Sequence, residues 1–356
     1  MKIVHVVEAS AAGTLSMVCI LANAQVNGGD EVEIVFSLRP ETPVDFRVMF
    51  DGKISFTQIE MCTKTEKLVS IRRLRSHLKE GDFDVLFMHS SFAGFVGRIA
   101  SININGLHKV FYLPHCISFM RRDISFIKAV AFVLLEWIGC VNRRSQYIAC
   151  SRSEFSAIRK WVPFAKCHLV ENAVSFSKRH DVSCKVAGRV VTVGQIRNQK
   201  GPADFIRIVE EINKVSDDFE FIWIGDGDDG FKRELIAAGV FVTGWKTQDE
   251  VFRLVGQAQL YLSCARWEGM PVSIIEAKYV KVPVIASECA GNIDVIVHER
   301  TGWLYKTPDA AVALILNLAK NHVMLSEVSE TAYIEAIDRF NEQRYVQDLR
   351  SLCAIG

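Results

Sequence analysis

The chain has 356 residues, of which 49% are hydrophobic, and its 42 basic and 41 acidic residues leave a net charge of +1. This length predicts two domains, and the high apolar content excludes a disordered chain. The near-neutral charge argues against a nucleic-acid-binding protein. Basic residues outnumber acidic ones in residues 1–170 and the reverse holds afterwards, so we expect the first half to face an anionic partner.

The first half alternates short apolar runs with helical patterns. We predict strands at residues 3–7, 32–36, 54–59, 85–88, 110–113 and 147–150. Between them we predict helices at residues 15–27, 67–79 and 127–142, a helix that ends near residue 102, and a helix capped by residues 151–154. The small-residue segment 8–14, which contains Gly13, is expected to be a loop. This alternation indicates a parallel sheet with helices on both faces.

The polar segment 175–188 is the expected interdomain linker. After it, strands are predicted at residues 190–193, 219–224, 241–243, 258–264, 282–286 and 301–304. We therefore predict two doubly wound α/β domains, residues 1–174 and 175–336, that face each other across a cleft. The helical segment 327–352 is expected to pack through Tyr333, Ile337, Phe340, Tyr345, Val346 and Leu349. Its last part, about residues 337–356, is expected to pack back on the first domain.

The ten cysteines are scattered, without a C-x-x-C pair or a Cys/His cluster at zinc spacing. This predicts a protein of the reducing cytoplasm without a structural metal. The first apolar run, residues 2–7, is too short for the core of a signal peptide, so we expect none. The longest apolar stretch, residues 129–141, is interrupted by Glu136 and is too short to span a bilayer.

The segment from Arg266 to Glu276 is the strongest candidate site. It follows a buried-strand pattern and becomes helical after Pro271, which suits the first turn of a helix. Gly269 lets a ligand approach the backbone, and amide groups at a helix start favour phosphate. Glu268 and Glu276 can each accept hydrogen bonds from sugar hydroxyls. The pattern indicates a nucleotide-sugar site; the alternative is a capping acid followed by an exposed helix acid.

Other loops of the second half are predicted at the same sheet edge, beyond the carboxyl ends of the strands. The loop from Gly194 to Gly201 brings Arg197 and Lys200 to a helix start, where cations and amides can hold a diphosphate. Residues 225–227, Gly244 and residues 287–292 supply further glycine-rich or small-residue turns. Each of them, taken alone, could also be an ordinary loop.

His115 follows Pro114 at the end of a first-half strand. A histidine there can donate to a sugar hydroxyl or to a developing charge. The alternative is a partly buried ring bonded to backbone, which we expect for His5, His168 and His322.

Several common chemistries are disfavoured by the sequence. The G-x-G-x-x-G motif is absent after the first strand, and Phe36-Ser37 stand where an acid would bind a ribose, so NAD binding is not expected. The sequence has no Ser-His-Asp, P-loop or H-E-x-x-H pattern, and no D-x-D placed to hold a metal. We expect neither a metal nor a cofactor.

Two basic clusters are candidates for binding an anionic membrane face. The first, on one helix, consists of Lys67, Arg72, Arg73, Arg75, His77 and Lys79. The second consists of Arg121, Arg122 and Lys128 beside the apolar helix, with Phe119, Phe126 and Phe132 around it. Basic residues beside apolar surface favour the inner-membrane surface, and exposed helix faces are the alternative. We expect a cytoplasmic protein that is peripheral on the cytoplasmic membrane face.

These loops together resemble those of glycosyltransferase family 4, retaining enzymes with two Rossmann-like domains in the GT-B arrangement. The family's E-x7-E motif is matched by Glu268 and Glu276. Its other motifs are matched, wholly or in part, by Gly194 with Lys200-Gly201, by residues 225–227, by residues 291–294 with Asp294 for Glu, and by Pro114-His115. Residues 89–98 and 151–154 resemble a bacterial surface-polysaccharide branch of the family.

The resemblance implies a role for each matched residue. Glu276 would hold the ribose hydroxyls, Glu268 would contact the donor sugar, and Lys200 would neutralise the diphosphate. His115 would lie beside the sugar and the acceptor. The implied catalytic residues are Glu268, His115 and Lys200, and the implied donor-binding residues are Gly13, Gly194, Arg197, Lys200, Gly225, Gly244, Glu268, Gly269, Met270, Pro271, Val272 and Glu276.

One departure from the family is Gln195, which stands where the family usually has arginine. Arg197 could replace that cation, or the transfer could be slower.

We therefore predict a retaining glycosyltransferase that takes a hexose or N-acetylhexosamine from a nucleotide diphosphate, with UDP as the expected carrier. The acceptor would be a hydroxyl of a lipid-linked glycan in bacterial O-antigen or capsule/exopolysaccharide synthesis. Two alternatives stay open: a nucleotide-sugar 2-epimerase of similar fold, and a non-catalytic glycan- or nucleotide-binding relative.

Overall fold

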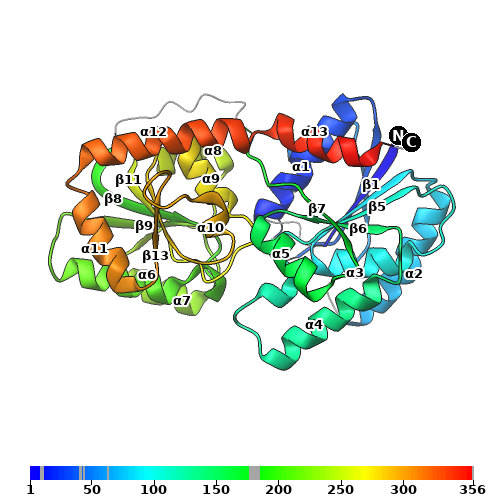
Figure 1. Ribbon diagram of the computed structural model, residues 1–356, viewed down its shortest axis with the longest axis horizontal. Coiled ribbons are helices and arrows are strands. Elements are labelled where there is room, and N and C mark those ends of the chain that lie inside the picture. The colour runs from blue at the N-terminus through cyan, green and yellow to red at the C-terminus, as the bar shows by residue number, and fades with distance from the viewer. Residues whose placement is uncertain (9–11, 40–41, 43–44, 62–63, 176–184, 355–356) are drawn as a thin grey trace. The chain divides into compact units, whose positions relative to one another are not determined.

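The computed structural model describes residues 1–8, 12–39, 42, 45–61, 64–175 and 185–354. The chain forms two compact units, each built around one sheet (Figure 1). The first unit contains Met1–Asn172 and Glu342–Gly356, and the second contains Ala173–Asn341.

The first unit is built on a seven-stranded parallel sheet with the order β3-β2-β1-β4-β5-β6-β7. The strands are β1 (Lys2–Val7), β2 (Glu31–Phe36), β3 (Ser55–Gln58), β4 (Val85–His89), β5 (Lys109–Leu113), β6 (Ser145–Ala149) and β7 (Lys166–Leu169). Strands β1 and β4 are almost continuous apolar runs because the sheet is covered on both faces. The strand order reverses between β1 and β4, which creates a topological switch point.

The described residues of this unit form the α-helices α1 (Ala12–Asn27), α2 (Lys64–Glu80), α3 (Ser91–Ala100), α4 (Phe126–Gly139), α5 (Arg152–Trp161) and α13 (Glu342–Cys353). Helix α3 lies close to the sheet because Gly94 and Gly97 have no side chain. A Cβ at Gly94 would stand 2.1 Å from the Tyr112 ring. Helix α13 packs against α1, and its Arg350 pairs with Asp30 at 3.4 Å.

The second unit has a six-stranded parallel sheet with the order β10-β9-β8-β11-β12-β13. Its strands are β8 (Val186–Val193), β9 (Glu220–Ile224), β10 (Phe241–Val242), β11 (Ala258–Ser263), β12 (Val284–Ser287) and β13 (Trp303–Tyr305). Its helices are α6 (Pro202–Asn213), α7 (Asp229–Ala237), α8 (Gln248–Gly256), α9 (Val272–Tyr279), α10 (Asn292–Val295), α11 (Pro308–Leu318) and α12 (His322–Arg339). The switch point lies between β8 and β11.

The predicted α/β class with two doubly wound sheets is confirmed, whereas several local predictions were wrong. Helix α1 begins at Ala12, so Gly13 lies in its first turn and not in a loop; residues 9–11 of that segment lie outside the described residues. The expected linker ends earlier than predicted because Val186 already pairs with Ala258 of β11. Residues 176–184 of the linker lie outside the described part of the chain.

The C-terminal segment also differs from its prediction. It forms two helices, α12 and α13, which are separated at Phe340 and Asn341. Phe340, Tyr345 and Leu349 are buried as predicted, but Ile337 is 38% exposed. A continuous helical pattern does not reveal such a break, because both helices keep an apolar face.

Candidate functional site

The loops after β8, β9, β11 and β12 gather at the carboxyl edge of the second sheet, around its switch point. In an open parallel sheet this edge is the usual place for a ligand. The structure brings Lys200, Glu268 and Glu276 to this edge, as the sequence predicted.

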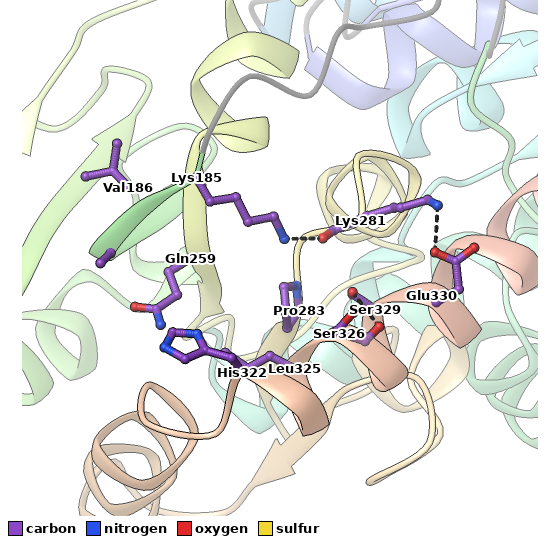
Figure 2. A pocket seen from close by; sticks show the side chains of 11 residues that line it. Lys185, Val186, Gln259, Lys281, Pro283, His322, Leu325, Ser326, Ser329 and Glu330 are labelled. Atoms are coloured by element: carbon purple, nitrogen blue, oxygen red, sulfur yellow. Dashed lines mark hydrogen bonds and ion pairs between the residues drawn. The ribbon is translucent and has the colours of Figure 1, made fainter.

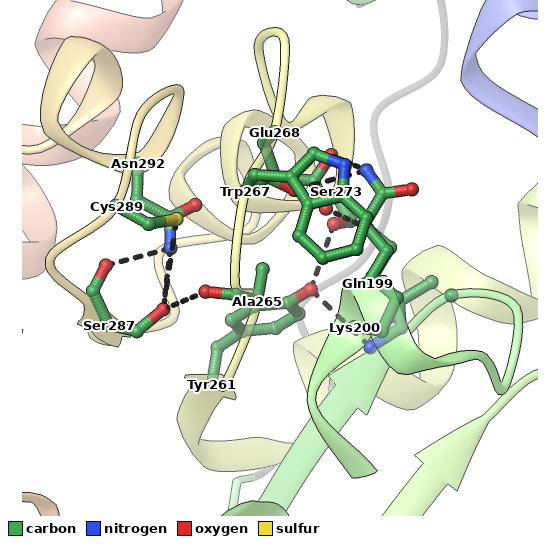
Figure 3. Close-up of polar contacts among 12 residues, drawn as sticks. Gln199, Lys200, Tyr261, Ala265, Trp267, Glu268, Ser273, Ser287, Cys289 and Asn292 are labelled. Atoms are coloured by element: carbon green, nitrogen blue, oxygen red, sulfur yellow. Dashed lines mark hydrogen bonds and ion pairs between the residues drawn. The ribbon is translucent and has the colours of Figure 1, made fainter. Parts of the chain in front are cut away.

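Lys200 lies at the end of a short 3-10 helix (Asn198–Lys200) that precedes α6. Its Nζ lies 2.8 Å from Glu268 Oε1 (Figure 3). Burial opposes the charge of Lys200, but the Glu268 carboxylate outweighs this and raises the lysine pKa. Gly194 makes room for the lysine stem, since its φ is +148° and a Cβ there would stand 2.7 Å from Lys200 Cε. Lys200 is therefore a positively charged side chain that Glu268 and the packing against Gly194 hold in place at the carboxyl edge of the second sheet.

Glu268 is held on both sides. Its backbone amide donates to Ala290 O at 2.9 Å, and Gln199 Nε2 donates to its Oε2 at 3.3 Å. Gly291 packs so closely against it that a Cβ would stand 2.5 Å from Glu268 Cβ. Asp294, which the sequence aligned with a family glutamate, instead accepts from the Gly291 amide at 3.1 Å and caps α10.

Met270 is buried and Gly269 follows Glu268 directly, leading into α9. Pro271 is the N-cap of α9, one residue before the first turn in which we expected it. Val272 begins the helix, whose first amides have no acceptor within the helix. The arrangement leaves a positive helix end beside the Lys200–Glu268 pair.

Glu276 lies on α9 and is buried, not exposed on the helix surface. Burial raises its pKa to about 7, although Gln248 donates to its Oε1 at 3.4 Å and Lys200 also favours the charged form. Tyr261 lies near both Lys200 and Glu276, and its hydroxyl donates to Ser273 Oγ at 2.9 Å. Burial raises the pKa of Tyr261, although the charge of Lys200 opposes this rise. Glu276 is thus a carboxyl that titrates near neutrality.

The turn at residues 225–227 lies against the lysine loop. Gly225 has φ +144° and pairs with Gly244, while Gly227 pairs with Ile196. Asp226 is bound by Lys232 at 2.9 Å, which lowers the pKa of the aspartate. Arg197 is exposed, and its charge works against the rise in the pKa of Lys200, so the two cations lie near each other.

The first sheet carries a different polar group at its own switch point. His5 of β1, His89 at the end of β4 and His115 after β5 form a line with Gln25 of α1, which we call the histidine chain. The contacts are Gln25 Oε1 to His5 Nε2 at 2.7 Å, His5 Nδ1 to His89 Nε2 at 3.0 Å, and His89 Nδ1 to His115 Nε2 at 3.0 Å. His5 therefore bonds side chains, whereas we had expected a backbone partner.

The turn that holds His115 is fixed by a buried acid. His115 and Cys116 have φ angles of 56° and 115°, in the left-handed region that side chains disfavour. Glu154 Oε1 accepts from the amides of Cys116 and Ile117 at 2.9 and 2.7 Å. The predicted cap residue thus holds the backbone of the His115 turn.

Glu8 was missed by the sequence analysis. It is buried at the end of β1, where Arg39 pairs with it and Ser90 Oγ donates to its Oε2 at 3.1 Å. Ser90 has φ 83°, an uncommon value for serine. The sequence signal was an acid that follows an apolar strand directly, but its partners are 31 and 82 positions away.

We expect the first unit to lose stability as the pH falls from about 6.5 towards 4. Burial lowers the pKa of His5 and of His115 to about 4, and that of His89 well below its usual value. These histidines take up protons at a higher pH in the unfolded chain than in the folded unit. The unit therefore has its full stability above the histidine pKa of the unfolded chain, and it loses stability as the pH falls below that value. For one histidine the full loss is roughly 3 kcal/mol.

Hydrogen exchange of β1, β4 and β5, corrected for the intrinsic rate, tests this. Protection should fall between about pH 7.5 and pH 5. Strands β8 and β11 are the control, because the raised pKa of Glu276 makes the second unit gain stability as pH falls through 7. Equal protection of β1 at both pH values would contradict the expectation.

A hollow of about 430 Å³ lies elsewhere in the second unit (Figure 2). Its lining residues include Lys185, Gln259 and Lys281, at the amino-terminal ends of strands, and Glu330 of α12. Because ligands of such sheets bind at the opposite edge, we do not assign it to the site. Among the described residues, no group of three or more His, Cys, Asp or Glu side chains could hold a metal.

Helix α4 (teal in Figure 1) has its apolar side on the outside. Phe126 and Ile127 are 80% and 79% exposed, while Glu136 is buried. The other exposed apolar side chains of this patch, called the α4 patch, are Val130, Leu134, Leu135, Trp137, Ile138, Val141, Trp161 and Phe164. Phe119 was expected here but packs against the core. Within the described residues, no helix is both long and apolar enough to cross a bilayer.

Some side chains of the first basic cluster bond to other residues of the first unit. Arg75 donates to the carbonyls of Ala100 and Ile102, and His77 pairs with Glu33 at 2.9 Å. The side chain of Lys67 lies outside the described residues.

Comparison with known proteins agrees with this geometry. Residues 13–178 match the model described as Glycosyltransferase Family 4, and residues 187–321 match Glycosyl transferases group 1. An uncharacterized 41.2 kDa protein in the cps region of Klebsiella pneumoniae is 31% identical over 247 residues, covering 65% of this chain and 68% of that protein.

Two other relatives carry more informative names. The UDP-Gal:alpha-D-GlcNAc-diphosphoundecaprenol alpha-1,3-galactosyltransferase of Escherichia coli is 24% identical over 327 residues, or 83% of this chain and 80% of that one. The Anabaena protein HepE, solved in complex with UDP and glucose, has a TM-score of 0.81 at 16% identity and covers all of both chains. The two sheets, the matched models and the Klebsiella relative together show that this chain belongs to glycosyltransferase family 4.

Proposed function

We propose that this protein transfers a hexose or N-acetylhexosamine from a UDP-sugar to a hydroxyl of a lipid-linked glycan during bacterial surface-polysaccharide synthesis, with retention of the anomeric configuration. The observation that carries the proposal is the Lys200–Glu268 ion pair, 2.8 Å long, beside the start of α9 at the switch point of the second sheet. One group suits a diphosphate, the other suits sugar hydroxyls, and both are held rigidly.

Lys200 stabilises the leaving diphosphate. Lys200 forms an ion pair with Glu268, and an ammonium group has three N–H donors, so donors remain for phosphate oxygens. The amides at the start of α9 and exposed Arg197 add positive potential on the same side. Arg197 thereby compensates for Gln195.

The reaction needs no separate protein base. As the bond between the sugar C1 and the phosphate oxygen breaks, the acceptor oxygen forms its bond to C1 from the same face, and its proton passes to the departing phosphate. Glu268 is already engaged by Lys200 and Gln199, which supports a binding role over that of a nucleophile. Retention is checked directly by NMR of the product's anomeric proton.

The relatives support the choice of donor and acceptor class. The Escherichia coli relative is named for UDP-galactose and a diphosphoundecaprenol-linked sugar, and the Anabaena neighbour was solved with UDP and glucose. The Klebsiella relative lies in a cps region.

A thermal-shift panel of UDP-, GDP- and dTDP-sugars tests the donor site. A specific donor should raise the Tm by mass action, and UDP-sugars should raise it most. Glu276→Gln should lose most of that shift. If none of these donors moves the transition, the donor-site assignment is wrong.

The affinity for a UDP-sugar should rise about tenfold between pH 6 and pH 8. The pKa of Glu276 is raised to about 7 by burial, so only about a tenth of the free protein carries the carboxylate at pH 6. Two ribose hydroxyls need two acceptor oxygens, which the ionised form provides. Calorimetric titration at both pH values measures this, and Glu276→Gln should bind weakly with a flat pH profile. The same rise in that variant would assign the titration to another group.

The α4 patch supports binding to an anionic bilayer. An apolar patch of this extent marks an interaction surface, and exposed Arg122, Lys128, Arg143 and Lys160 flank it. The protein should sediment with vesicles that contain anionic lipid and much less with neutral ones. Ile127→Ser with Ile138→Ser should abolish sedimentation without unfolding, whereas Val323→Ser with Ile334→Ser, which removes exposed residues of α12, should not.

A further inference from the structure

One segment of the first unit connects the carboxyl edge of its sheet to the apolar helix α4. It begins at the turn after β5, continues through a short 3-10 helix (Ser118–Met120) and ends at Ser125, which caps α4. Because α4 leads from β5 back to the parallel strand β6, it runs away from the carboxyl edge, where ligands of such sheets bind. The segment therefore joins the ligand-binding edge to the α4 patch.

This segment and the first turn of α4 carry a surplus of positive charge. Residues 118–130 contain three basic residues, Arg121, Arg122 and Lys128, and one acid, Asp123, so three charges minus one leave +2. Arg121 binds both oxygens of Asp123, at 3.0 and 2.8 Å. The side chains of Arg122 and Lys128 are exposed, and neither forms a hydrogen bond or an ion pair with another residue that the structure describes. Both cations are therefore available to a ligand.

The backbone that carries these two cations is held on both sides. Glu154 fixes the turn after β5, and Ser118 Oγ donates to Ser91 Oγ at 2.7 Å, at the start of α3. The buried pair of Arg98 and Glu136 fixes α4 to α3 and leaves the apolar side of α4 outward. The cations thus keep their place between the sheet edge and the α4 patch.

An acceptor that carries its sugar on a lipid diphosphate has its chemical groups in the same order as this surface. The sheet edge suits the sugar, the basic segment suits the diphosphate, and the α4 patch suits the apolar chain and the bilayer around it. A diphosphate that is esterified at both ends carries one negative charge on each phosphoryl group near neutral pH. The surplus charge of the segment matches these charges.

We propose that Arg122 and Lys128 bind the diphosphate of the lipid-linked acceptor. This inference rests on the proposed glycosyl transfer and names the residues that select a charged acceptor. Arg122 offers paired N–H donors that match two phosphate oxygens, and Lys128 adds a compact charge. Phosphate headgroups of a bilayer offer the same chemistry, so the experiment separates the two sources.

Calorimetric titration of the full chain with short-chain probes tests the site without a bilayer. Both probes carry N-acetylglucosamine and an octyl chain, joined by a diphosphate in one and directly by a glycosidic bond in the other. We expect the diphosphate probe to bind about tenfold more tightly, the worth of one hydrogen bond to a charged group. Arg122→Gln with Lys128→Gln should remove most of this difference and leave the affinity for the uncharged probe unchanged.

The chain offers a matched control at the other end of α4. Arg143→Gln with Lys160→Gln also removes two exposed cations beside the α4 patch, and it should leave the affinity for both probes unchanged. An equal loss of diphosphate affinity in this control would assign the effect to net charge and overturn the proposal. Equal affinity of the parent protein for the two probes would also overturn it.

Vesicle sedimentation identifies the other source of phosphate. If Arg122→Gln with Lys128→Gln weakens binding to anionic vesicles but not to the diphosphate probe, the two cations serve bilayer headgroups and the proposal is wrong. In the transfer assay this variant should raise the acceptor KM about tenfold and leave the donor KM unchanged. The calorimetric result needs neither donor nor turnover, so it distinguishes failure of this site from failure of the proposed glycosyl transfer.

Discussion

Replacing Lys200 with methionine should lower kcat by about 100- to 1000-fold, the range expected for loss of one preorganised group that stabilises developing charge. Methionine keeps the length of the side chain and removes only the cation. Lys200 Nζ lies 2.8 Å from Glu268 Oε1, and its stem packs closely against Gly194, where a Cβ would stand 2.7 Å from Lys200 Cε. The variant also leaves the Glu268 carboxylate without its counter-ion, which adds to the loss.

The measurement is steady-state transfer with a UDP-sugar, together with calorimetric affinity for the same donor. Affinity should fall much less than kcat, because the charge on the diphosphate grows as the bond to the sugar breaks. Lys214→Met is the control, since Lys214 forms an exposed pair with Glu211 on the surface of the same unit. A kcat within about threefold of the parent would remove Lys200 from the mechanism.

Replacing Arg98 with methionine should destabilise the protein by about 3–5 kcal/mol, the cost of leaving a buried charge without its partner. Arg98 is fully buried, and its Nη2 lies 2.6 Å from Glu136 Oε2. Its guanidinium also lies 4.5 Å from the centre of the Tyr112 ring, and its Nε donates to Gly94 O at 2.9 Å. Burial opposes the arginine charge, but Glu136 outweighs it and raises the pKa of Arg98.

Urea unfolding of the single variant and of Arg98→Met with Glu136→Leu separates the causes. The double variant should recover most of the lost stability, because no unpaired charge is left. The same pair joins α3 to α4, so hydrogen exchange in α4 should rise in the single variant. A loss of less than about 1 kcal/mol would contradict the expectation and would mean that the Tyr112 and Tyr147 hydroxyls, which also donate to Glu136, suffice to hold its charge.

The sequence predicted what local patterns determine. Buried strand patterns followed by glycine-rich loops located Lys200, Glu268 and Glu276 at one sheet edge, because parallel strands share the direction of their carboxyl ends. It could not show that Lys200 and Glu268 touch, since that contact depends on how the loops after β8 and β11 pack. The burial of Glu276 was likewise a matter of tertiary packing.

The histidine chain could not be predicted from the sequence, and the α4 patch was predicted only in part. His5, His89 and His115 come together only because β1, β4 and β5 are adjacent in the sheet, and strand order is not written in any local pattern. For α4, the sequence predicted basic residues and Phe126 beside an apolar helix, but it did not show which side of the helix faces outward. Only Glu136 within that helix signalled the inverted orientation, and its partner Arg98 lies 38 positions away.

The most direct test of the account is a transfer assay with the purified full chain, a UDP-hexose and a synthetic acceptor that carries N-acetylglucosamine on a lipid diphosphate. Mass spectrometry should find one added hexose, NMR should find the anomeric configuration of the donor retained, and Lys200→Met should form almost no product. Release of an epimerised nucleotide sugar without an acceptor would contradict the account. So would the absence of transfer from every UDP-, GDP- and dTDP-sugar by a folded protein.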